Sequence, residues 1–452
     1  MGIWAFNLNI SSHFCVHRVK FVYLTTYLIK AGMKIEKIKI ENYKVYRNTE
    51  IRNLSNFSVF LGANGAGKST LFDVFGFLSD ALKANVKTAL NKRGGYREVY
   101  SRDGEGPILF EIKFRNDKIE GETQPLITYR LEIGFENGLP IITTEILSYR
   151  RGGYGRPYRF LDFHRGEGTA IINEDEYSSS SSSTFQDRRE QQTLDSPDIL
   201  AIKGLGQFQK FKAISSFRRL LDDWYVSNFQ IQEARNVEDV GFSEHLSTSG
   251  NNLAQVTRYI WENHRNVFNT ILEKFRKRVP GVENVIAEET QDGRIVLKFK
   301  DNSFQDPFVA RFVSDGTIKM FAYLVLLNDP VKHPLLCVEE PENYLHPELL
   351  PELAEEFREY ADKGGQVFIS THSPDFVNAL QPDELFWLQK SNGATTIRKA
   401  SEDATIKALY ANGDKLGWLW REGYLKGSGP YESRKAWTVW NFLSKKGRWQ
   451  KC

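Results

Sequence analysis

A glycine-rich segment near the start of the chain has the residue types and spacing of a phosphate-binding loop. It fits the pattern G-x-x-x-x-G-K-[ST] and reads Gly62-Ala63-Asn64-Gly65-Ala66-Gly67-Lys68-Ser69-Thr70. Its glycines let the backbone fold tightly, so that N–H groups point at phosphate oxygens. In this pattern the lysine reaches the β- and γ-phosphates, and the hydroxyl of Ser69 binds Mg²⁺. The segment predicts a site for ATP and Mg²⁺, with a chance match in a glycine-rich turn as the alternative.

Two adjacent glutamates, Glu339 and Glu340, follow the apolar run 335–338. Paired carboxylates at the end of a buried strand suit two tasks of ATP hydrolysis. Glu339 would orient the ligands of Mg²⁺, and Glu340 would polarise the attacking water. His372 follows a second apolar run, 366–370, and can contact the γ-phosphate from there. A structural role is the alternative for a single histidine.

Ser314 and Gly316 stand where a strand is expected to end and a helix to begin. A serine hydroxyl and a glycine amide at a helix N-terminus suit a phosphate group. An N-capped helix without a ligand explains the same two residues. Their position shortly before the two glutamates favours the phosphate site.

These residues require strands and helices that hold them, and the hydrophobic pattern predicts such elements. Residues 58–61 read as a buried strand that enters the loop, and a helix follows to about Leu82, with its N-terminal dipole favouring anions. Further strands are predicted at 34–40 and 48–53, and an antiparallel meander at 108–114, 126–133 and 141–149. Residues 285–300 are predicted to form a hairpin with its turn at 291–293. Helical spacing at 200–229 and 252–278 predicts a helical insertion.

The composition is that of an ordinary soluble globular protein. Hydrophobic residues make up 41% of the 452 residues, and the net charge of +3 neither requires nor excludes nucleic acid. The cysteines Cys15, Cys337 and Cys452 follow no metal spacing, which favours a reduced, cytoplasmic protein. The apolar stretch 19–29 is too short for a membrane-spanning helix, and we expect no membrane partner.

Together, these motifs resemble those of the ABC-type AAA-family ATPases, and within them the RecF-like and SMC-like branch, over most of residues 33–427. Residues 62–69 match the Walker A loop, and residues 335–340 match Walker B, with Glu339 where many members carry Asp. Residues 314–317 look like the signature motif, and His372 matches the switch histidine. Residues 341–347 look like the stretch that follows Walker B in this branch. Residues 40–44 are similar to its first-strand motif, whose basic residue, here Lys44, lies near the nucleotide.

The resemblance implies an α/β fold with an ABC-type P-loop NTPase core, in which helices flank a mixed sheet. An antiparallel β meander and an inserted helical lobe would be attached to this core. We expect an extension outside the fold at 1–32, a first ATPase lobe at 33–170 and a serine-rich loop at 171–197. The helical insertion would follow at 198–280, the completion of the core at 281–430 and a basic tail at 431–452. No glutamine is assigned to a Q-loop.

The resemblance also implies a head-to-tail homodimer. Each ATP would lie between the Walker motifs of one subunit and the Ser314 segment of the other, and hydrolysis would release the dimer. Roles in this branch are DNA repair, chromosome handling and defence against phage, often with a nuclease. No D-x-D motif of a Toprim nuclease follows His372, so we expect any effector, such as a nuclease, to be a separate protein. Aromatic and arginine residues within 151–168 are candidate DNA contacts, with solvated hairpin surface as the alternative.

Two other functions are compatible with the motifs. The nucleotide-binding subunit of a membrane transporter shares all four, but its signature usually follows Walker A more closely than here, where the two lie at Lys68 and Ser314. A non-hydrolysing scaffold is the other alternative. It is disfavoured by the presence of both Glu340 and His372.

Overall fold

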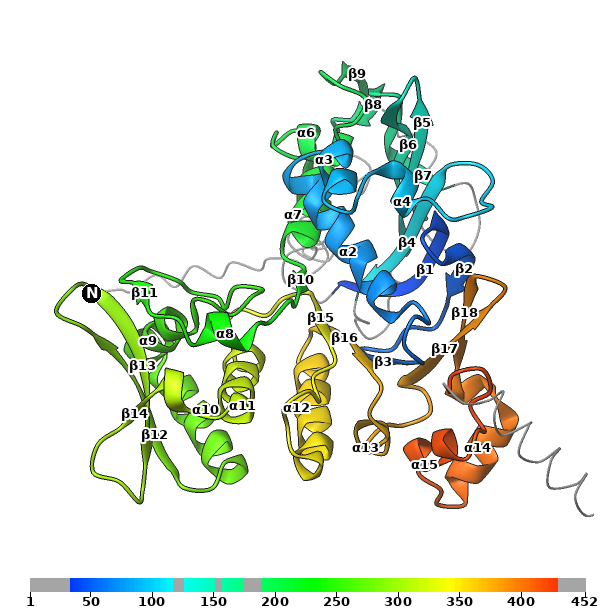
Figure 1. The fold of residues 1–452 in the computed structure, drawn as a ribbon. Helices are drawn as coiled ribbons and strands as arrows, with labels where there is room; N and C mark the ends of the chain where they lie inside the picture. The colour runs from blue at the N-terminus through cyan, green and yellow to red at the C-terminus, as the bar shows by residue number, and fades with distance from the viewer. Residues whose placement is uncertain (1–32, 117–125, 151–156, 174–187, 430–452) are drawn as a thin grey trace, which may run out of the picture. The chain divides into compact units, whose positions relative to one another are not determined.

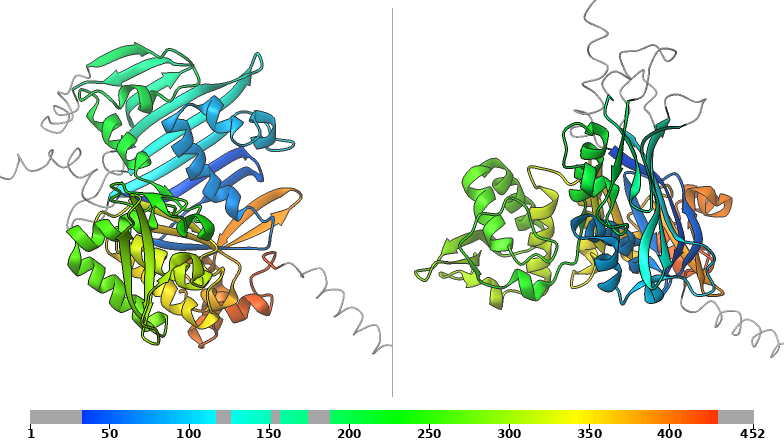
Figure 2. Two further views of the ribbon diagram at one scale, coloured as in Figure 1. Left: turned by 60° about the vertical axis from the view of Figure 1, so that its left-hand side comes forward. Right: turned by 90° about the horizontal axis from the view of Figure 1, so that it is seen from above.

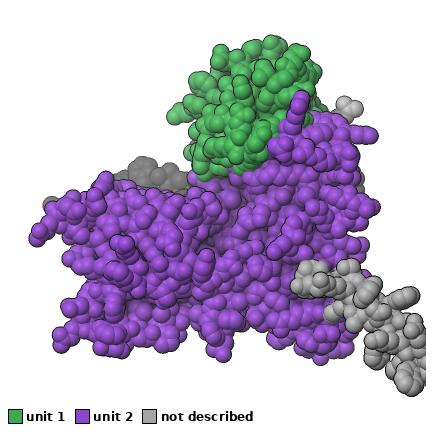
Figure 3. All heavy atoms as spheres, in the orientation of Figure 1, with its two compact units in different colours: residues 1–33, 79–96, 109–222 green, residues 34–78, 97–108, 223–452 purple. Residues whose placement is uncertain are grey.

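The computed structural model describes residues 33–116, 126–150, 157–173 and 188–429 (Figure 1). The chain divides into two compact units, of which unit 1 comprises residues 1–33, 79–96 and 109–222 and unit 2 the remainder (Figure 3). Several predicted features lie outside the described residues: the extension 1–32, the basic tail 431–452, the six serines 178–183 and residues 151–156 of the aromatic and arginine-rich segment. The predicted domain boundaries stay predictions.

The central sheet of unit 2 has the strand order β10-β15-β16-β3-β17-β18. The strands are β3 (Phe57–Leu61), β10 (Tyr225–Val226), β15 (Leu335–Glu339), β16 (Gln366–Thr371), β17 (Leu385–Ser391) and β18 (Ala394–Lys399). All neighbours pair in parallel except β17 and β18, which are antiparallel. Because carboxyl ends of parallel strands meet at one edge, the segments that follow β3, β15 and β16 gather there.

Hydrophobic side chains on both faces explain why these strands are central. β3 and β16 are buried at every position, which is typical of parallel strands covered on both sides. Phe60 on β3 packs against the rings of Phe368 and Phe386 from the neighbouring strands. It also meets Phe72 on helix α2 (Lys68–Lys83), so the same core holds the helix that follows the phosphate loop.

Other elements of unit 2 extend this core. The antiparallel pair β1 (Met33–Tyr43) and β2 (Tyr46–Ile51) precedes β3. Helix α12 (Leu350–Asp362) joins β15 to β16. The short helices are α4 (Tyr96–Val99), α13 (Pro374–Val377), α14 (Ala404–Ala411) and α15 (Leu416–Arg421). No helix in the described ranges is both long and apolar enough to cross a membrane.

A helical lobe in unit 2 carries the Ser314 segment (Figure 2). Its helices are α8 (Ile231–Ala234), α9 (Leu253–Asn263), α10 (Arg265–Arg278) and α11 (Asp315–Leu327). Its strands are β11 (Glu238–Asp239), β12 (Val282–Glu289), β13 (Arg294–Asp301) and β14 (Phe308–Val309). The antiparallel β12–β13 pair confirms the predicted hairpin. Residues 318–327 of α11 are all buried, so this helix is internal to the lobe.

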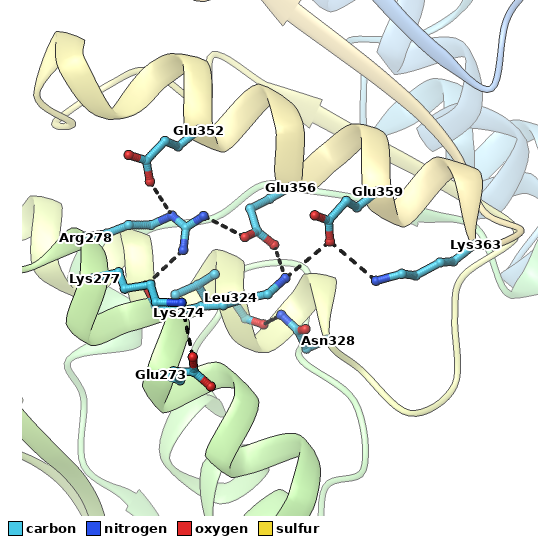
Figure 4. Close-up of polar contacts among 10 residues, drawn as sticks. All are labelled: Glu273, Lys274, Lys277, Arg278, Leu324, Asn328, Glu352, Glu356, Glu359 and Lys363. Atoms are coloured by element: carbon cyan, nitrogen blue, oxygen red, sulfur yellow. Dashed lines mark hydrogen bonds and ion pairs between the residues drawn. The ribbon is translucent and has the colours of Figure 1, made fainter.

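Charged side chains join α10 to α12, the helix between β15 and β16 (Figure 4). Glu356 on α12 is almost fully buried and accepts hydrogen bonds from Lys274 at 2.5 Å and Arg278 at 2.7 Å. Arg278 also pairs with Glu352 at 3.2 Å. Buried charges are tolerated when they are paired and hydrogen-bonded, so this cluster fixes one helix against the other.

Unit 1 contains the predicted antiparallel meander. Its strands follow each other in the order β4 (Ile108–Asn116), β5 (Leu126–Glu136), β6 (Leu139–Arg150), β7 (Tyr158–His164), β8 (Glu167–Ile171) and β9 (Arg189–Thr193). Its helices include α3 (Val86–Asn91), α6 (Ala201–Leu205) and α7 (Lys212–Asp222). Buried Glu145 accepts hydrogen bonds from the N–H groups of Ala201 and Ile202, and burial raises its pKa to about 7.

The α/β fold class is confirmed, with one local difference. Helical spacing extends through residues 200–229, but Tyr225–Val226 form the edge strand β10, which pairs in parallel with β15. Pairing with the central sheet therefore overrides the local helical pattern at this point. The remaining helices of the predicted insertion are divided, with α6 and α7 in unit 1 and α8 to α10 in unit 2.

Candidate functional site

The predicted phosphate loop connects β3 to α2 in a conformation that requires glycine. Gly65 and Gly67 have φ angles of +75° and +105°, in the left-handed region. A Cβ atom on Gly67 would also lie 2.8 Å from the side chain of Val45. The loop is held by hydrogen bonds from Tyr46 to the carbonyl of Gly67 and from Thr395 to that of Ala66, each 2.8 Å long.

Lys68 is folded over the loop that precedes it. Its Nζ atom donates to the carbonyl oxygens of Gly62 at 2.7 Å and Ala63 at 3.3 Å. Burial lowers the pKa of Lys68, and the nearby Glu340, Glu342 and Glu339 act in the opposite direction. The ammonium group and the N-terminal dipole of α2 place positive charge where phosphates are expected.

Ser69 and Glu339 are brought together from positions far apart in the sequence. The Ser69 hydroxyl donates to the Glu339 carboxylate at 2.5 Å. Burial raises the pKa of Glu339, and so do the charges of Glu340 and Asp73, whereas Ser69 and Lys68 lower it. A hydroxyl and a carboxylate are the hard oxygen ligands that Mg²⁺ prefers, and Mg²⁺ commonly takes few protein ligands beside phosphates and water. The donor set therefore fits this ion.

The second glutamate and the histidine also meet. Glu340 directly follows β15 and has a φ of +44°, and its carboxylate accepts a hydrogen bond from Asn343 at 3.1 Å. The Nδ1 atom of His372 lies 3.2 Å from the other oxygen of this carboxylate. Buried Glu342 accepts hydrogen bonds from the hydroxyl of Thr371 and the N–H of His372 and so fixes the end of β16.

Lys44 follows β1 and contacts the helix after the phosphate loop. Its Nζ atom lies 2.5 Å from the carboxylate of Asp73 on α2. Lys44 itself adopts a φ of +51°. The structure thus places Lys44 beside α2, and its predicted proximity to the nucleotide stays a prediction.

Ser314 caps helix α11, as its capping alternative predicts. Its hydroxyl accepts from the N–H of Thr317 at 3.2 Å and lies 2.7 Å from the Thr317 hydroxyl. A Cβ atom on Gly316 would lie 2.6 Å from the carbonyl oxygen of Tyr344, so only glycine allows this approach. Neighbouring Phe312 is 77% exposed.

Arg235 contacts the residues on both sides of Ser314. It donates to the carbonyl of Val313 and forms an ion pair with Asp315 at 2.6 Å. Sequence reasoning missed Arg235, Tyr46 and Thr395, which belong to no local motif. It also assigned no role to Glu342 or Asn343, although both lie in the stretch 341–347 that resembles the branch.

Comparisons with known proteins identify a family and a fold for this chain. Residues 57–378, more than half of the chain, match the protein family described as "AAA domain, putative AbiEii toxin, Type IV TA system". A segment of 86 residues is 33% identical to the DNA double-strand break repair Rad50 ATPase of Pyrococcus abyssi. That segment covers 19% of this chain and only 9% of the relative.

The fold has a counterpart among solved structures. The crystal structure of an SMC head bound to the C-winged helix domain of ScpA is similar, with a TM-score of 0.50 at 15% identity. The similarity covers 82% of this chain and 99% of the SMC head chain. The chain belongs to the AAA domain family that it matches, and it is an ABC-type, SMC-like ATPase related to defence and repair ATPases.

Proposed function

We propose that this protein hydrolyses MgATP to ADP and phosphate within an ATP-gated, head-to-tail homodimer. One observation carries the proposal: the Ser69–Glu339 pair and the Glu340–His372 pair lie at the same edge of one sheet, with separations of 2.5 and 3.2 Å. A metal-binding pair beside a carboxylate base is the arrangement that phosphoryl transfer to water requires. The phosphate loop before α2 supplies the third part of this site.

Each group has a distinct task in the proposed reaction. Backbone N–H groups of residues 62–70 and the ammonium of Lys68 bind the phosphates. Ser69 and Glu339 would hold Mg²⁺, which would supply positive charge to the phosphates of bound ATP. Glu340 accepts a proton from the attacking water, and His372 orients this carboxylate while contacting the γ-phosphate.

Ser314 and Gly316 act on the nucleotide of the partner subunit in this proposal. The hydroxyl of Ser314 contacts its own helix turn, and exposed Phe312 adjoins it, so another molecule can approach this end of α11. ATP bound at the phosphate loop of a second copy would meet the N-terminus of α11, where anions are favoured. Because ATP favours the closed dimer and its hydrolysis products do not, turnover would open the dimer.

We further propose that the dimer acts in the cytoplasm, either on DNA or on a separate effector protein, in DNA repair or defence against phage. The family description names a toxin, and the Rad50 relative is a DNA repair ATPase. Double-stranded DNA should stimulate hydrolysis, and moderate salt should weaken the effect because phosphate contacts are electrostatic. Hydrolysis indifferent to DNA would favour a protein target.

The test of ATP hydrolysis is a comparison of Glu340→Gln with the wild type. Phosphate release should fall about 10²- to 10⁴-fold, the usual contribution of a general base. ATP-bound dimer should accumulate in analytical ultracentrifugation. Glu348→Gln is the matched control, since Glu348 lies in the next turn and is highly exposed. Normal turnover in Glu340→Gln would contradict the assigned role of this carboxylate.

A further inference from the structure

Lys319 is a buried lysine on the signature helix α11, five positions after Ser314. It is 6% exposed, and burial lowers its pKa to about 8, while Glu342 and Glu340 act in the opposite direction. Lysine side chains are seldom this buried unless they have partners, because removing an ammonium from water is costly. The contacts of Lys319 therefore indicate what the residue does.

The ammonium of Lys319 holds the backbone of the proposed catalytic glutamate. Its Nζ atom donates to the carbonyl oxygen of Glu340 at 3.3 Å. The same atom lies over the rings of Tyr323 and Tyr344, at 5.6 and 5.7 Å from their centroids. Residues with positive φ other than glycine are strained and persist when their surroundings fix them. Lys319 is one of the groups that fix Glu340 at its φ of +44°.

Helix α11 contacts the turn after Walker B at a second point. Gly316, one turn before Lys319, approaches the carbonyl of Tyr344 so closely that a Cβ would lie 2.6 Å away. Glu342, between these two contact points, is buried and attracts the Lys319 ammonium. The first turns of α11 thus contact the turn 340–344 at its first and last residues, so a shift of one segment requires a shift of the other.

We infer that Lys319 is a positioning residue that couples the Ser314 end of α11 to the carboxylate of Glu340. When a partner subunit's nucleotide contacts Ser314, α11 transmits this contact through Lys319 to the glutamate of its own subunit. Hydrolysis at one site thereby depends on occupation of the other. The inference rests on the proposed ATP hydrolysis, and it adds a residue that no motif of the sequence includes.

Lys319→Met tests the inference, since it removes the ammonium but keeps an unbranched, apolar side chain that suits a buried position. We expect kcat to fall about 10-fold or more, with KM and the Kd for MgATP within about twofold of wild type. Lys319→Arg, which keeps a charged donor, should recover part of kcat. Lys298→Met on the β12–β13 hairpin is the matched control and should keep the wild-type rate.

A double-mutant cycle separates positioning from a general structural effect. If Lys319 acts through Glu340, Lys319→Met should cause no further loss in a Glu340→Gln background. Additive losses, or a kcat for Lys319→Met within twofold of wild type, would overturn the inference and leave the proposed function intact. Wild-type protein without ATPase activity would overturn both. If Lys319→Met fails to fold in thermal melting, Lys319→Gln takes its place in the same cycle.

Discussion

The phosphate loop and the signature segment, both in unit 2, differ in what completes them. Around the loop, Lys68 contacts the loop carbonyls and Ser69 contacts Glu339, all at 2.5 to 3.3 Å. In the signature segment, Ser314 contacts only its own turn among the described residues, and Phe312 is 77% exposed. In the proposed function, one chain would therefore supply the phosphate and metal ligands, whereas its signature segment would act on a second molecule.

The two segments are also fixed by different means. The loop conformation depends on backbone geometry that only glycine adopts easily, supported by two neutral hydrogen bonds from Tyr46 and Thr395. The signature segment depends on a helix cap and on the charged side chain of Arg235. Changes in the loop should therefore affect binding of the nucleotide, and changes in the signature segment should affect turnover.

The largest effect is expected from Lys68→Ala in the phosphate loop. The Kd for MgATP should rise about 100-fold or more, since hydrogen bonds from charged groups contribute about 1.5–3 kcal/mol each. Isothermal titration calorimetry measures this directly. Lys363→Ala, which removes an exposed lysine from the end of α12, should bind MgATP normally. Equal affinities of wild type and Lys68→Ala for MgATP would contradict the assignment of this loop to the nucleotide site.

Ser314→Ala should lower turnover about 10-fold, while the Kd for MgATP of the monomer stays within about twofold of wild type. Loss of the cap should also cost about 1 kcal/mol of unfolding free energy. Asp403→Ala, which removes the cap of α14, serves as the control because it costs similar stability without touching the site. A turnover equal in the two variants would show that Ser314 is only a cap.

Arg235→Lys should have a smaller effect on the same segment. Lysine keeps the charge but cannot bind the Val313 carbonyl and the Asp315 carboxylate with one planar group. We expect turnover to fall about three- to fivefold, with nucleotide affinity unchanged. Steady-state phosphate release gives the first value and calorimetry the second. A loss of nucleotide affinity instead would contradict the division between the two segments.

The smallest effect concerns pH and Glu339, the carboxylate that contacts Ser69 of the loop. Burial raises the pKa of Glu339, so this carboxyl becomes protonated at a higher pH than an ordinary glutamate as the solution is acidified. A protonated carboxyl is a poor metal ligand, and Mg²⁺ affinity should therefore begin to fall at a higher pH than for an ordinary glutamate ligand as the solution is acidified. In Glu339→Gln, measured with the same ATP, the Mg²⁺ affinity should lack the part of the pH dependence that comes from this carboxyl. An identical pH profile in both proteins would contradict the role of Glu339.

Much of the site was predictable because its parts belong to short local patterns. The loop 62–70, the glutamates after the run 335–338 and His372 each adjoin a buried strand, and parallel pairing brings their ends together. Arg235, Lys319 and Thr395 were not predictable in this way. Thr395, for example, contacts Ala66 across 329 positions of sequence. Only the folded chain places such residues beside the motifs, and no periodicity indicates them.

The fold shows the same division between local and distant information. Alternation predicted the meander in unit 1 and the β12–β13 hairpin, since both are formed by neighbours in the sequence. The edge strand β10 has two residues and exists through its pairing with β15, more than a hundred positions away. Its local sequence reads as helix. Long-range pairing therefore determines the elements that the hydrophobic pattern misassigns.

Mixing two inactive variants tests most directly whether the phosphate loop of one subunit works with the signature segment of another. Lys68→Ala removes the loop lysine, and Ser314→Arg blocks the signature segment. We expect each protein alone to be inactive and an equimolar mixture to regain activity, with about a quarter of the wild-type ATPase rate as the upper limit and a lower rate where the intact site depends through Lys319 on its empty neighbour. Random assortment makes half of the dimers mixed, and each mixed dimer has one intact site of two. No recovery in mixtures that form mixed dimers would contradict the account.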